Sequence, residues 1–313
     1  MKIVITDSGF PNIDPETVVI ADAGFQLSSA QCKTAEDVIA AAADADGLIV
    51  QWAPVTAKVI GNLTRCKVVV RYGIGVDNVD LAAAKQKGIP VCNVPDYCID
   101  EVADHTVALA LAQARQLTQI DARIRAGIWK IHPDRPMPSF SDMTFATVGY
   151  GRIARAVLDR ARTFGFTVAA YDPYATLSSD RVVPLSLDEL FRQADILSLH
   201  VPLTPKTKHL VNADRLTKMK PTAIVVNTAR GGLIDTVALA QSLQAGTIAA
   251  AGLDVFESEP LETDHPLRKC PNALLTSHVA WYSERSVPRL QRMAAQEAVR
   301  ALRGEPLKNQ VNQ

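Results

Sequence analysis

Short runs of β-branched and other apolar residues alternate along the chain with segments whose apolar residues recur at helical spacing. In the first third of the chain, strands are predicted at 2–7, 47–50, 67–72 and 89–94, and helices at 35–45 and 81–88. Strands that alternate with helices in this way are typical of a parallel sheet with helices on both faces. This part of the chain is therefore predicted to be α/β.

The alternation stops in the middle of the chain. Residues 100–127 contain no predicted strand and are predicted to form one helix, with Asp100 as the N-cap and Gly127 at the C-terminal end. The middle of this helix, TVALALA, is apolar on nearly every side. Because an apolar helix must be covered on all its faces, the pattern favours a helix between domains or across a dimer contact.

A second alternating series begins at residue 142, after a proline-rich loop. Gly149, Gly151 and Ala154 occupy the positions of a G-x-G-x-x-G/A motif between an apolar strand and a helix. The first glycine permits a tight turn, and the second lets backbone amides approach a pyrophosphate at the positive end of the helix dipole. Asp172 ends the next strand, where a carboxylate binds both hydroxyls of an adenosine ribose and repels a 2′-phosphate. The motif therefore predicts a Rossmann unit that binds NAD rather than NADP.

Polar residues follow the later strands, which are predicted at 194–200, 223–229, 247–255 and 273–277. The carboxyl ends of the strands in a doubly wound sheet open on the cofactor side, so Arg230, Glu259 and His278 are predicted to converge there. A guanidinium binds a carboxylate through two donors, an imidazole exchanges a proton near neutral pH, and a carboxylate orients the imidazole. Taken singly, the three residues also fit a surface ion pair, a loop acid and a satisfied polar group.

Composition and charge fit a globular protein without a strongly charged partner. The 313 residues are 48% hydrophobic, and 33 Lys and Arg residues balance 33 Asp and Glu residues. A chain without net charge lacks the basic surface that is typical of proteins that bind nucleic acid or anionic membranes. No apolar run is long enough to cross a membrane, and the N-terminal segment reaches Asp7 too soon for a signal peptide. The sequence predicts a soluble, cytoplasmic protein with neither a nucleic acid nor a membrane as partner.

The cysteines and histidines do not indicate a metal site. The five cysteines are odd in number and lack CxxC spacing, so we expect reduced, mostly buried thiols. Five histidines lack the spacing of metal ligands and are expected to be structural or exposed: His105, His132, His200, His209 and His265. His105 lies within the long predicted helix, where we expect a packed or interfacial residue.

Six stretches, taken in order, resemble the D-2-hydroxyacid dehydrogenase family over nearly the whole chain. They are RYGIGVDNVD (71–80), EVADHTVAL (101–109), VGYGRIA (148–154), NTARGGLID (227–235), LDVFESEP (253–260) and SHVAWYSE (277–284). The resemblance implies an α/β fold of two doubly wound parallel-sheet domains. Residues 1–98 and 283–313 would form a flavodoxin-like substrate domain, and residues 99–282 an inserted Rossmann domain that binds NAD. It also implies a homodimer formed around the Rossmann domain.

The resemblance also implies the residues of the site. Arg230, Glu259 and His278 match the catalytic arginine, glutamate and histidine of the family, and Ile74 and Gly75 match a loop whose amides bind the substrate carboxylate. The positions that line NAD are matched by Thr106, Gly149, Tyr150, Gly151, Arg152, Ile153, Asp172, Val201, Pro202, Thr207, Thr228, Ala229 and Asp254. The one departure, Ala154 in place of a third glycine, adds a single methyl group where the helix meets the strand.

Two stretches, HVAWYSERS and VPDYCIDEVADH, are similar to the branch of the family that includes the C-terminal-binding proteins and phosphoglycerate dehydrogenases. In that branch a tryptophan at the position of Trp281 lines the substrate pocket, and Arg71 matches a second arginine near the substrate. Packing alone accounts equally well for Trp281, because buried tryptophan is common in any core.

The resemblance predicts an NAD-dependent enzyme that interconverts a small 2-keto acid and its D-2-hydroxy acid. The alternative is an NAD(H)-sensing binding protein with little turnover, like the corepressors of the same branch. Retention of all three catalytic positions favours the enzyme, and Glu259 argues against a formate dehydrogenase, whose histidine pairs with glutamine. The substrate side chain stays open among glyoxylate, hydroxypyruvate, pyruvate, phosphoglycerate and longer thioether or aromatic keto acids.

Overall fold

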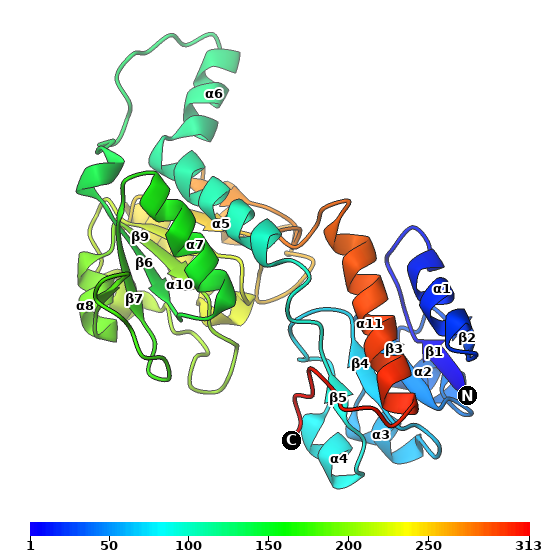
Figure 1. Ribbon diagram of the computed structural model, residues 1–313. Helices are drawn as coiled ribbons and strands as arrows, with labels where there is room; N and C mark the ends of the chain where they lie inside the picture. Colours follow the sequence, from blue (N-terminus) through cyan, green and yellow to red (C-terminus); the bar gives the residue numbers. More distant parts are fainter. The chain divides into compact units, whose positions relative to one another are not determined.

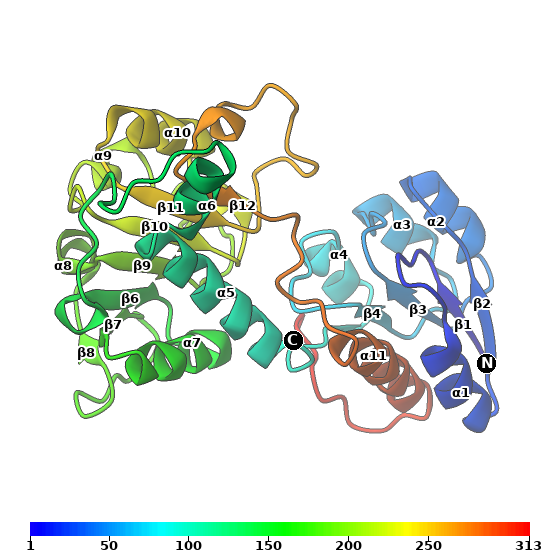
Figure 2. The ribbon, with the colours of Figure 1, turned by 90° about the horizontal axis from the view of Figure 1, so that it is seen from above.

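The computed structural model describes all 313 residues, which form two compact units. The first unit comprises Met1–Cys98 and Tyr282–Gln313, and the second comprises Ile99–Trp281. Each unit contains one sheet in which neighbouring strands are parallel (Figures 1 and 2). This confirms the α/β fold of two parallel-sheet domains.

The first unit is a five-stranded sheet with helices on both faces. In chain order its elements are β1 (Lys2–Ile5), α1 (Asp14–Asp22), β2 (Gln26–Ser29), α2 (Ala35–Ala41), β3 (Gly47–Val50), α3 (Ala57–Asn62), β4 (Val69–Arg71), α4 (Leu81–Gln86), β5 (Val91–Cys92) and α11 (Ser286–Leu302). The strand order β2-β1-β3-β4-β5 is that of flavodoxin-like folds. Helices α2, α3 and α4 share a core with one face of the sheet, while α1 packs against α11, which contacts β3 and β4. The C-terminal helix therefore completes the unit that the N-terminus begins.

The second unit is a seven-stranded sheet. Its elements are α5 (Ile99–Ala114), α6 (Leu117–Arg125), η1 (Phe140–Asp142), β6 (Thr144–Val148), α7 (Arg152–Thr163), β7 (Thr167–Tyr171), β8 (Val183–Pro184), α8 (Leu187–Gln193), β9 (Ile196–Leu199), α9 (Ala213–Leu216), β10 (Ile224–Asn227), η2 (Gly231–Leu233), α10 (Thr236–Ala245), β11 (Ala250–Leu253), η3 (Pro266–Lys269) and β12 (Ala273–Leu275). The strand order is β8-β7-β6-β9-β10-β11-β12. The chain reverses its direction of progress between β6 and β9, which is where Rossmann folds bind their ligands.

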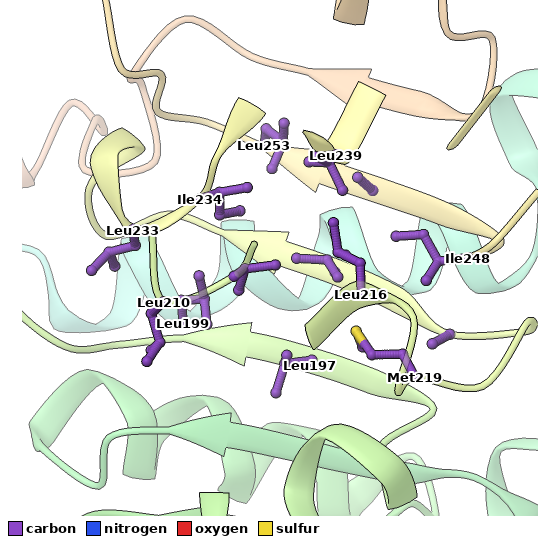
Figure 3. Close-up of a cluster of buried hydrophobic side chains, with 14 of the residues drawn as sticks. Leu197, Leu199, Leu210, Leu216, Met219, Leu233, Ile234, Leu239, Ile248 and Leu253 are labelled. Carbon is purple, nitrogen blue, oxygen red and sulfur yellow. The ribbon is translucent and has the colours of Figure 1, made fainter. Parts of the chain in front are cut away.

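Alternating side chains of the central strands build two cores in the second unit. On β10, Val225 faces a cluster shared with α8, α9 and α10, whereas Ile224 and Val226 face a cluster shared with α5 and α7. Figure 3 shows part of the first cluster, in which Leu197 of β9 and Leu253 of β11 lie among side chains from the covering helices and loops. Burial of each such side chain stabilises the fold by about 1.5–3 kcal/mol.

The prediction of one helix over 100–127 is wrong. The helix is broken between α5 and α6, where Gln116 has a left-handed φ of 51°. The buried Gln116 side chain donates a hydrogen bond to the carbonyl of Arg135 (3.0 Å), and its own amide bonds to Gln113 (3.2 Å). This tertiary contact turns the chain at a point where the local pattern is still helical. Asp100 also lies in the first turn rather than at the N-cap, because α5 begins at Ile99.

Helix α5 packs against α7, β10 and β11 of its own unit. Its apolar residues are therefore covered on one side without a second domain, and the predicted dimer contact stays a prediction. All five cysteines are buried and free, as predicted. None of the helices combines the length and the apolar content that are needed to cross a membrane.

Candidate active site

Arg230 follows β10 in a turn that its neighbours shape. The fully buried Asn227 accepts a hydrogen bond from the amide of Ala229 (3.0 Å) and donates one to the carbonyl of Arg230 (2.8 Å). A Cβ atom on Gly231 would lie 1.8 Å from the carbonyl carbon of Phe256, so only glycine lets this turn approach the segment after β11 so closely. The half-buried Arg230 is thereby placed beside the segment that carries Glu259.

Glu259 and His278 form a hydrogen-bonded pair. His278 Nδ1 lies 2.7 Å from Glu259 Oε2, and the other carboxylate oxygen accepts the amide of Phe256 (2.9 Å). Burial raises the pKa of Glu259, but the bonds from His278 and Phe256 and the charges of His278 and Arg230 outweigh burial and lower that pKa below its ordinary value. The group is therefore a carboxylate at neutral pH. Because a carboxylate only accepts hydrogen bonds, Nδ1 carries a proton and Nε2 is left to exchange one.

The backbone of His278 is held in a left-handed conformation, with φ of 57°. A left-handed non-glycine residue persists where surrounding contacts determine it, since the conformation costs about 1–3 kcal/mol. Here the fully buried Asp254 supplies those contacts. Its carboxylate accepts the amides of Val279 (3.0 Å) and Ala280 (2.9 Å) and the hydroxyl of Thr276 (2.5 Å), and its carbonyl accepts the amide of His278 (2.7 Å). The direction of the imidazole is therefore set by the backbone as well as by Glu259.

Trp281 contributes to the same turn. Its indole N–H donates a hydrogen bond to the carbonyl of His278 (2.8 Å), three residues earlier. This contact is consistent with the packing alternative for Trp281. Its predicted place in the substrate pocket stays a prediction.

The glycine-rich loop has the geometry that a dinucleotide requires. Gly149 has φ of 98°, and a Cβ atom there would lie 2.5 Å from the carbonyl oxygen of His200. Gly151 caps α7, and a Cβ atom there would meet no atom within 4 Å. The carboxylate of Asp172, just after β7, accepts the amide of Tyr150 (2.8 Å). The acid is therefore bonded to the loop itself, so these residues fit NAD.

The other predicted cofactor residues lie at neighbouring strand ends. Thr106 Oγ1 of α5 lies 2.7 Å from Thr228 Oγ1, just past β10. Thr207 donates a hydrogen bond to the carbonyl of Pro202 (2.7 Å) and so closes the loop that follows β9. Four residues complete the set: Arg152 and Ile153 in the first turn of α7, Val201 after β9 and Ala229 after β10. Their contact with NAD stays a prediction.

The predicted substrate residues of the first unit lie together at the end of β4. Gly73 has φ of 127°, and a Cβ atom there would lie 1.8 Å from Arg71 Nη1, so glycine makes room for the guanidinium. The next residues are anchored by the amide of Val94, which donates to Gly73 O (2.9 Å), and by Asn93, which donates to Ile74 O (2.7 Å). The segment that contains Ile74 and Gly75 thus has a defined conformation.

Sequence reasoning missed several polar contacts. His209, expected to be structural or exposed, bonds to Glu257 (2.6 Å), and His105 bonds to Thr276 (3.0 Å). Burial lowers the pKa of His200 to about 4, so that ring is neutral at neutral pH. The only sequence feature that could have indicated the role of Glu257 was its position two residues before Glu259. No sequence feature indicated the role of Thr276.

Known proteins identify the family. Residues 107–280, more than half of the chain, match the NAD binding domain of D-isomer specific 2-hydroxyacid dehydrogenases. The chain belongs to this family. The match confirms the predicted family and NAD as the cofactor of the second unit.

Relatives and solved structures agree with this assignment. A D-3-phosphoglycerate dehydrogenase from Methanocaldococcus jannaschii is 37% identical over all of this chain and 59% of its own length. A glyoxylate reductase from Korarchaeum cryptofilum is 38% identical over 83% of this chain and 80% of its own. The structure of D-lactate dehydrogenase from Aquifex aeolicus with NAD and lactic acid is 27% identical, with a TM-score of 0.87 over 97% of this chain and 96% of its own. The chain spans 52% to 59% of the length of the phosphoglycerate dehydrogenases that it matches.

Proposed function

We propose that the chain is an NAD-dependent dehydrogenase that interconverts a small 2-keto acid and its D-2-hydroxy acid. The observation that carries the proposal is the pair formed by His278 and Glu259, with the positive charge of Arg230 acting on the same carboxylate. These groups follow β10, β11 and β12 in the unit that matches the NAD-binding domain. An acid–base group and a carboxylate-binding cation are the two elements that reduction of a 2-keto acid requires from the protein.

His278 is the proposed proton donor and acceptor. Bound NADH supplies the hydride for the carbonyl carbon, and NAD accepts it in the reverse direction. His278 Nε2 donates a proton to the carbonyl oxygen during reduction and takes it from the hydroxyl during oxidation. Glu259 keeps the proton on Nδ1 and stabilises the imidazolium form, because its charge is opposite and the two side chains are hydrogen-bonded.

Arg230 is the proposed anchor for the substrate. Its guanidinium would bind the carboxylate and polarise the adjacent carbonyl, and charged hydrogen bonds of this kind contribute about 1.5–3 kcal/mol each. By family resemblance, the amides of Ile74 and Gly75 would bind the same carboxylate, with Arg71 and Trp281 beside the substrate side chain. Glyoxylate and phosphoglycerate are the first proposed substrates, because two relatives are named glyoxylate reductase and D-3-phosphoglycerate dehydrogenase.

A homodimer is also part of the proposal. Helix α6 and the segment after it expose large apolar side chains, including Trp129 and Ile131, each with 84% of its surface accessible. Leu117, Ile124 and Ile128 are exposed on the same stretch. Exposed apolar side chains of this size are typical of a protein interface. Because the family resemblance implies a homodimer, a second copy of the chain is the proposed partner at this surface. Sedimentation equilibrium that yields only the monomer mass would overturn this part.

The test of the activity is loss of NADH absorbance with a panel of 2-keto acids, which includes glyoxylate, hydroxypyruvate, 3-phosphohydroxypyruvate, pyruvate and longer analogues. We expect turnover with at least one small acid. Where the product is chiral, unlike the glycolate formed from glyoxylate, a D-specific but not an L-specific dehydrogenase should reoxidise it. NADH binding without turnover across the panel would instead favour an NAD(H)-sensing binding protein. An L-product would contradict the proposed stereochemistry.

A further inference from the structure

Helix α5 presents two adjacent polar residues to the strand ends of the candidate site. Thr106 bonds to Thr228, which precedes Arg230 by two residues. His105 Nε2 lies 3.0 Å from Thr276 Oγ1, and Thr276 precedes His278 by two residues. One turn of one helix therefore reaches the segments that carry both the proposed anchor and the proposed acid–base residue.

The protons that Asp254, Thr276 and His105 carry determine which group donates in each hydrogen bond. The Asp254 carboxylate is fully buried and, as an ion, only accepts hydrogen bonds. The Thr276 hydroxyl donates its single proton to Asp254 Oδ1 at 2.5 Å. Thr276 must then accept from His105, so His105 carries a proton on Nε2. The three groups form a hydrogen-bond relay, in which His105 donates to Thr276 and Thr276 donates to Asp254.

This relay ends at the turn that contains His278. Both oxygens of Asp254 accept backbone amides, from Val279 and Ala280, which directly follow His278. Asp254 is thus shared between α5 and the left-handed turn. A change in how Thr276 and His105 hold the carboxylate is transmitted to the backbone that aims the imidazole.

Close packing of α5 on β11 makes the contact possible. A Cβ atom on Gly252 would lie 2.9 Å from the Cβ of Leu109, which is closer than side chains normally approach. The absence of a side chain at Gly252 lets α5 lie against the strand that ends at Leu253, just before Asp254. His105, one helical turn before Leu109, is thereby brought within reach of Thr276.

We propose that His105 is a positioning residue for His278 and acts through Thr276 and Asp254. The inference rests on the proposed function. Loss of the Nε2–H donor removes the bond that fixes the Thr276 hydroxyl, so the bond from Thr276 to the buried carboxylate is less well aligned. The imidazole of His278 is then less well aimed at the substrate, while the glycine-rich loop is unchanged.

The experiment compares a variant without a donor with a variant that retains one. His105→Leu keeps the approximate size of the side chain but removes the donor, whereas His105→Gln places an amide N–H near the position of Nε2. Thr276→Val and Thr276→Ser form a second such pair. Gln296→Leu, on the exposed side of α11 in the first unit, is the control. Each variant is measured for kcat with the best acid of the panel, for NADH dissociation constant by fluorescence, and for the solvent deuterium isotope effect on kcat.

We expect His105→Leu and Thr276→Val to lower kcat by about ten- to hundredfold, the effect of a misplaced catalytic group. The solvent isotope effect should rise, because proton transfer becomes more rate-limiting, and the NADH dissociation constant should stay within about twofold, as expected when the dinucleotide loop is untouched. The Gln and Ser variants should recover most of the lost kcat. Gln296→Leu should match the unmodified chain.

Unchanged kcat and isotope effect in Thr276→Val would overturn the inference, even if His105→Leu failed to fold. The inference would also be wrong if kcat and NADH binding fell together without rescue by Gln or Ser, because that result indicates a purely structural role. Failure of the proposed function is distinguishable, since it would appear as no turnover of the unmodified chain with any acid of the panel, or as full turnover in His278→Ala.

Discussion

Two histidine–glutamate pairs lie in the second unit, and their local geometry is nearly the same. His278 Nδ1 lies 2.7 Å from Glu259, and His209 Nε2 lies 2.6 Å from Glu257. Both histidines have left-handed backbones, with φ of 57° and 49°. The exposed fractions of the side chains are also alike, 44% and 36% in the first pair and 37% and 33% in the second. Distance and exposure therefore do not identify an acid–base residue.

The two pairs differ in which ring nitrogen of the histidine binds the glutamate. Glu259 binds Nδ1, next to the backbone, so Nε2 at the tip of His278 is left for a substrate. Glu257 binds the tip nitrogen of His209, and its other oxygen accepts the amide (3.1 Å) and hydroxyl (2.6 Å) of Thr236 at the start of α10. A carboxylate at a helix N-terminus is favoured by the helix dipole. The second pair is therefore built to hold α10 and the loop of His209.

The charges around the two pairs also differ. The pKa of Glu259 is lowered in part by the guanidinium of Arg230, whereas the pKa of Glu257 is lowered, against burial, by its bonds to Thr236 and His209. A cation that can bind a substrate carboxylate thus acts on the first pair. A proton donor is therefore recognised by the ring nitrogen that is left available and by the charged group that lies beside it.

The largest expected effect separates the two histidines directly. His278→Ala should lower kcat by at least about 10², the size of general acid–base catalysis, whereas His209→Ala should lower it by less than about tenfold. NADH binding, measured by fluorescence titration, should survive in His278→Ala. Equal losses of kcat in the two variants would mean that the comparison fails to identify the proton donor.

The two pairs should also differ in how they affect the pH dependence of the reaction. Reduction requires protonated His278 and should slow as pH rises, while oxidation should accelerate. Glu259→Gln removes the charge that stabilises imidazolium, so the midpoint of the reduction profile should move to lower pH, with a loss of kcat of about tenfold. Glu257→Gln is the matched control, and its midpoint should not move. Rate profiles recorded with chemistry rate-limiting check this, and a flat profile in both directions would contradict it.

The smallest expected effect is on stability. The pKa of Glu257 is lowered in the folded chain, so its interactions stabilise the fold above the ordinary carboxyl pKa, and this stabilisation is lost as pH falls through the folded value. At neutral pH, Glu257→Gln should be less stable by about 0.5–1 kcal/mol, a value reduced for partial exposure. Urea unfolding at pH 7 and at about pH 3 should show a gap that closes in acid. A gap that stays constant with pH would exclude an ionic contribution.

Features set by neighbouring residues were predictable from the sequence. The spacing of Gly149, Gly151 and Asp172 follows from one strand–turn–helix–strand unit, and the strand ends before Arg230 and His278 follow from apolar runs. The hydrogen bond between Glu259 and His278 was expected because parallel strands end on the same edge of a sheet. The local sequence pattern was sufficient in each case, because the regular geometry of a strand or helix determines where the residues at its end lie.

Features set by distant residues were not predictable in this way. Gln116 breaks the long helix through a contact with Arg135 that helical periodicity does not encode. The bond between His105 and Thr276 joins residues 171 positions apart.

By itself, the sequence determined the alternation of strands and helices, the dinucleotide motif and the residue types at the strand ends. Tertiary structure alone decided which nitrogen of each histidine is occupied and which buried carboxylate holds the turn of His278. The physical reason is range: periodicity and glycine spacing act over a few residues, whereas hydrogen-bond partners are chosen only when packing brings separate elements within about 3 Å.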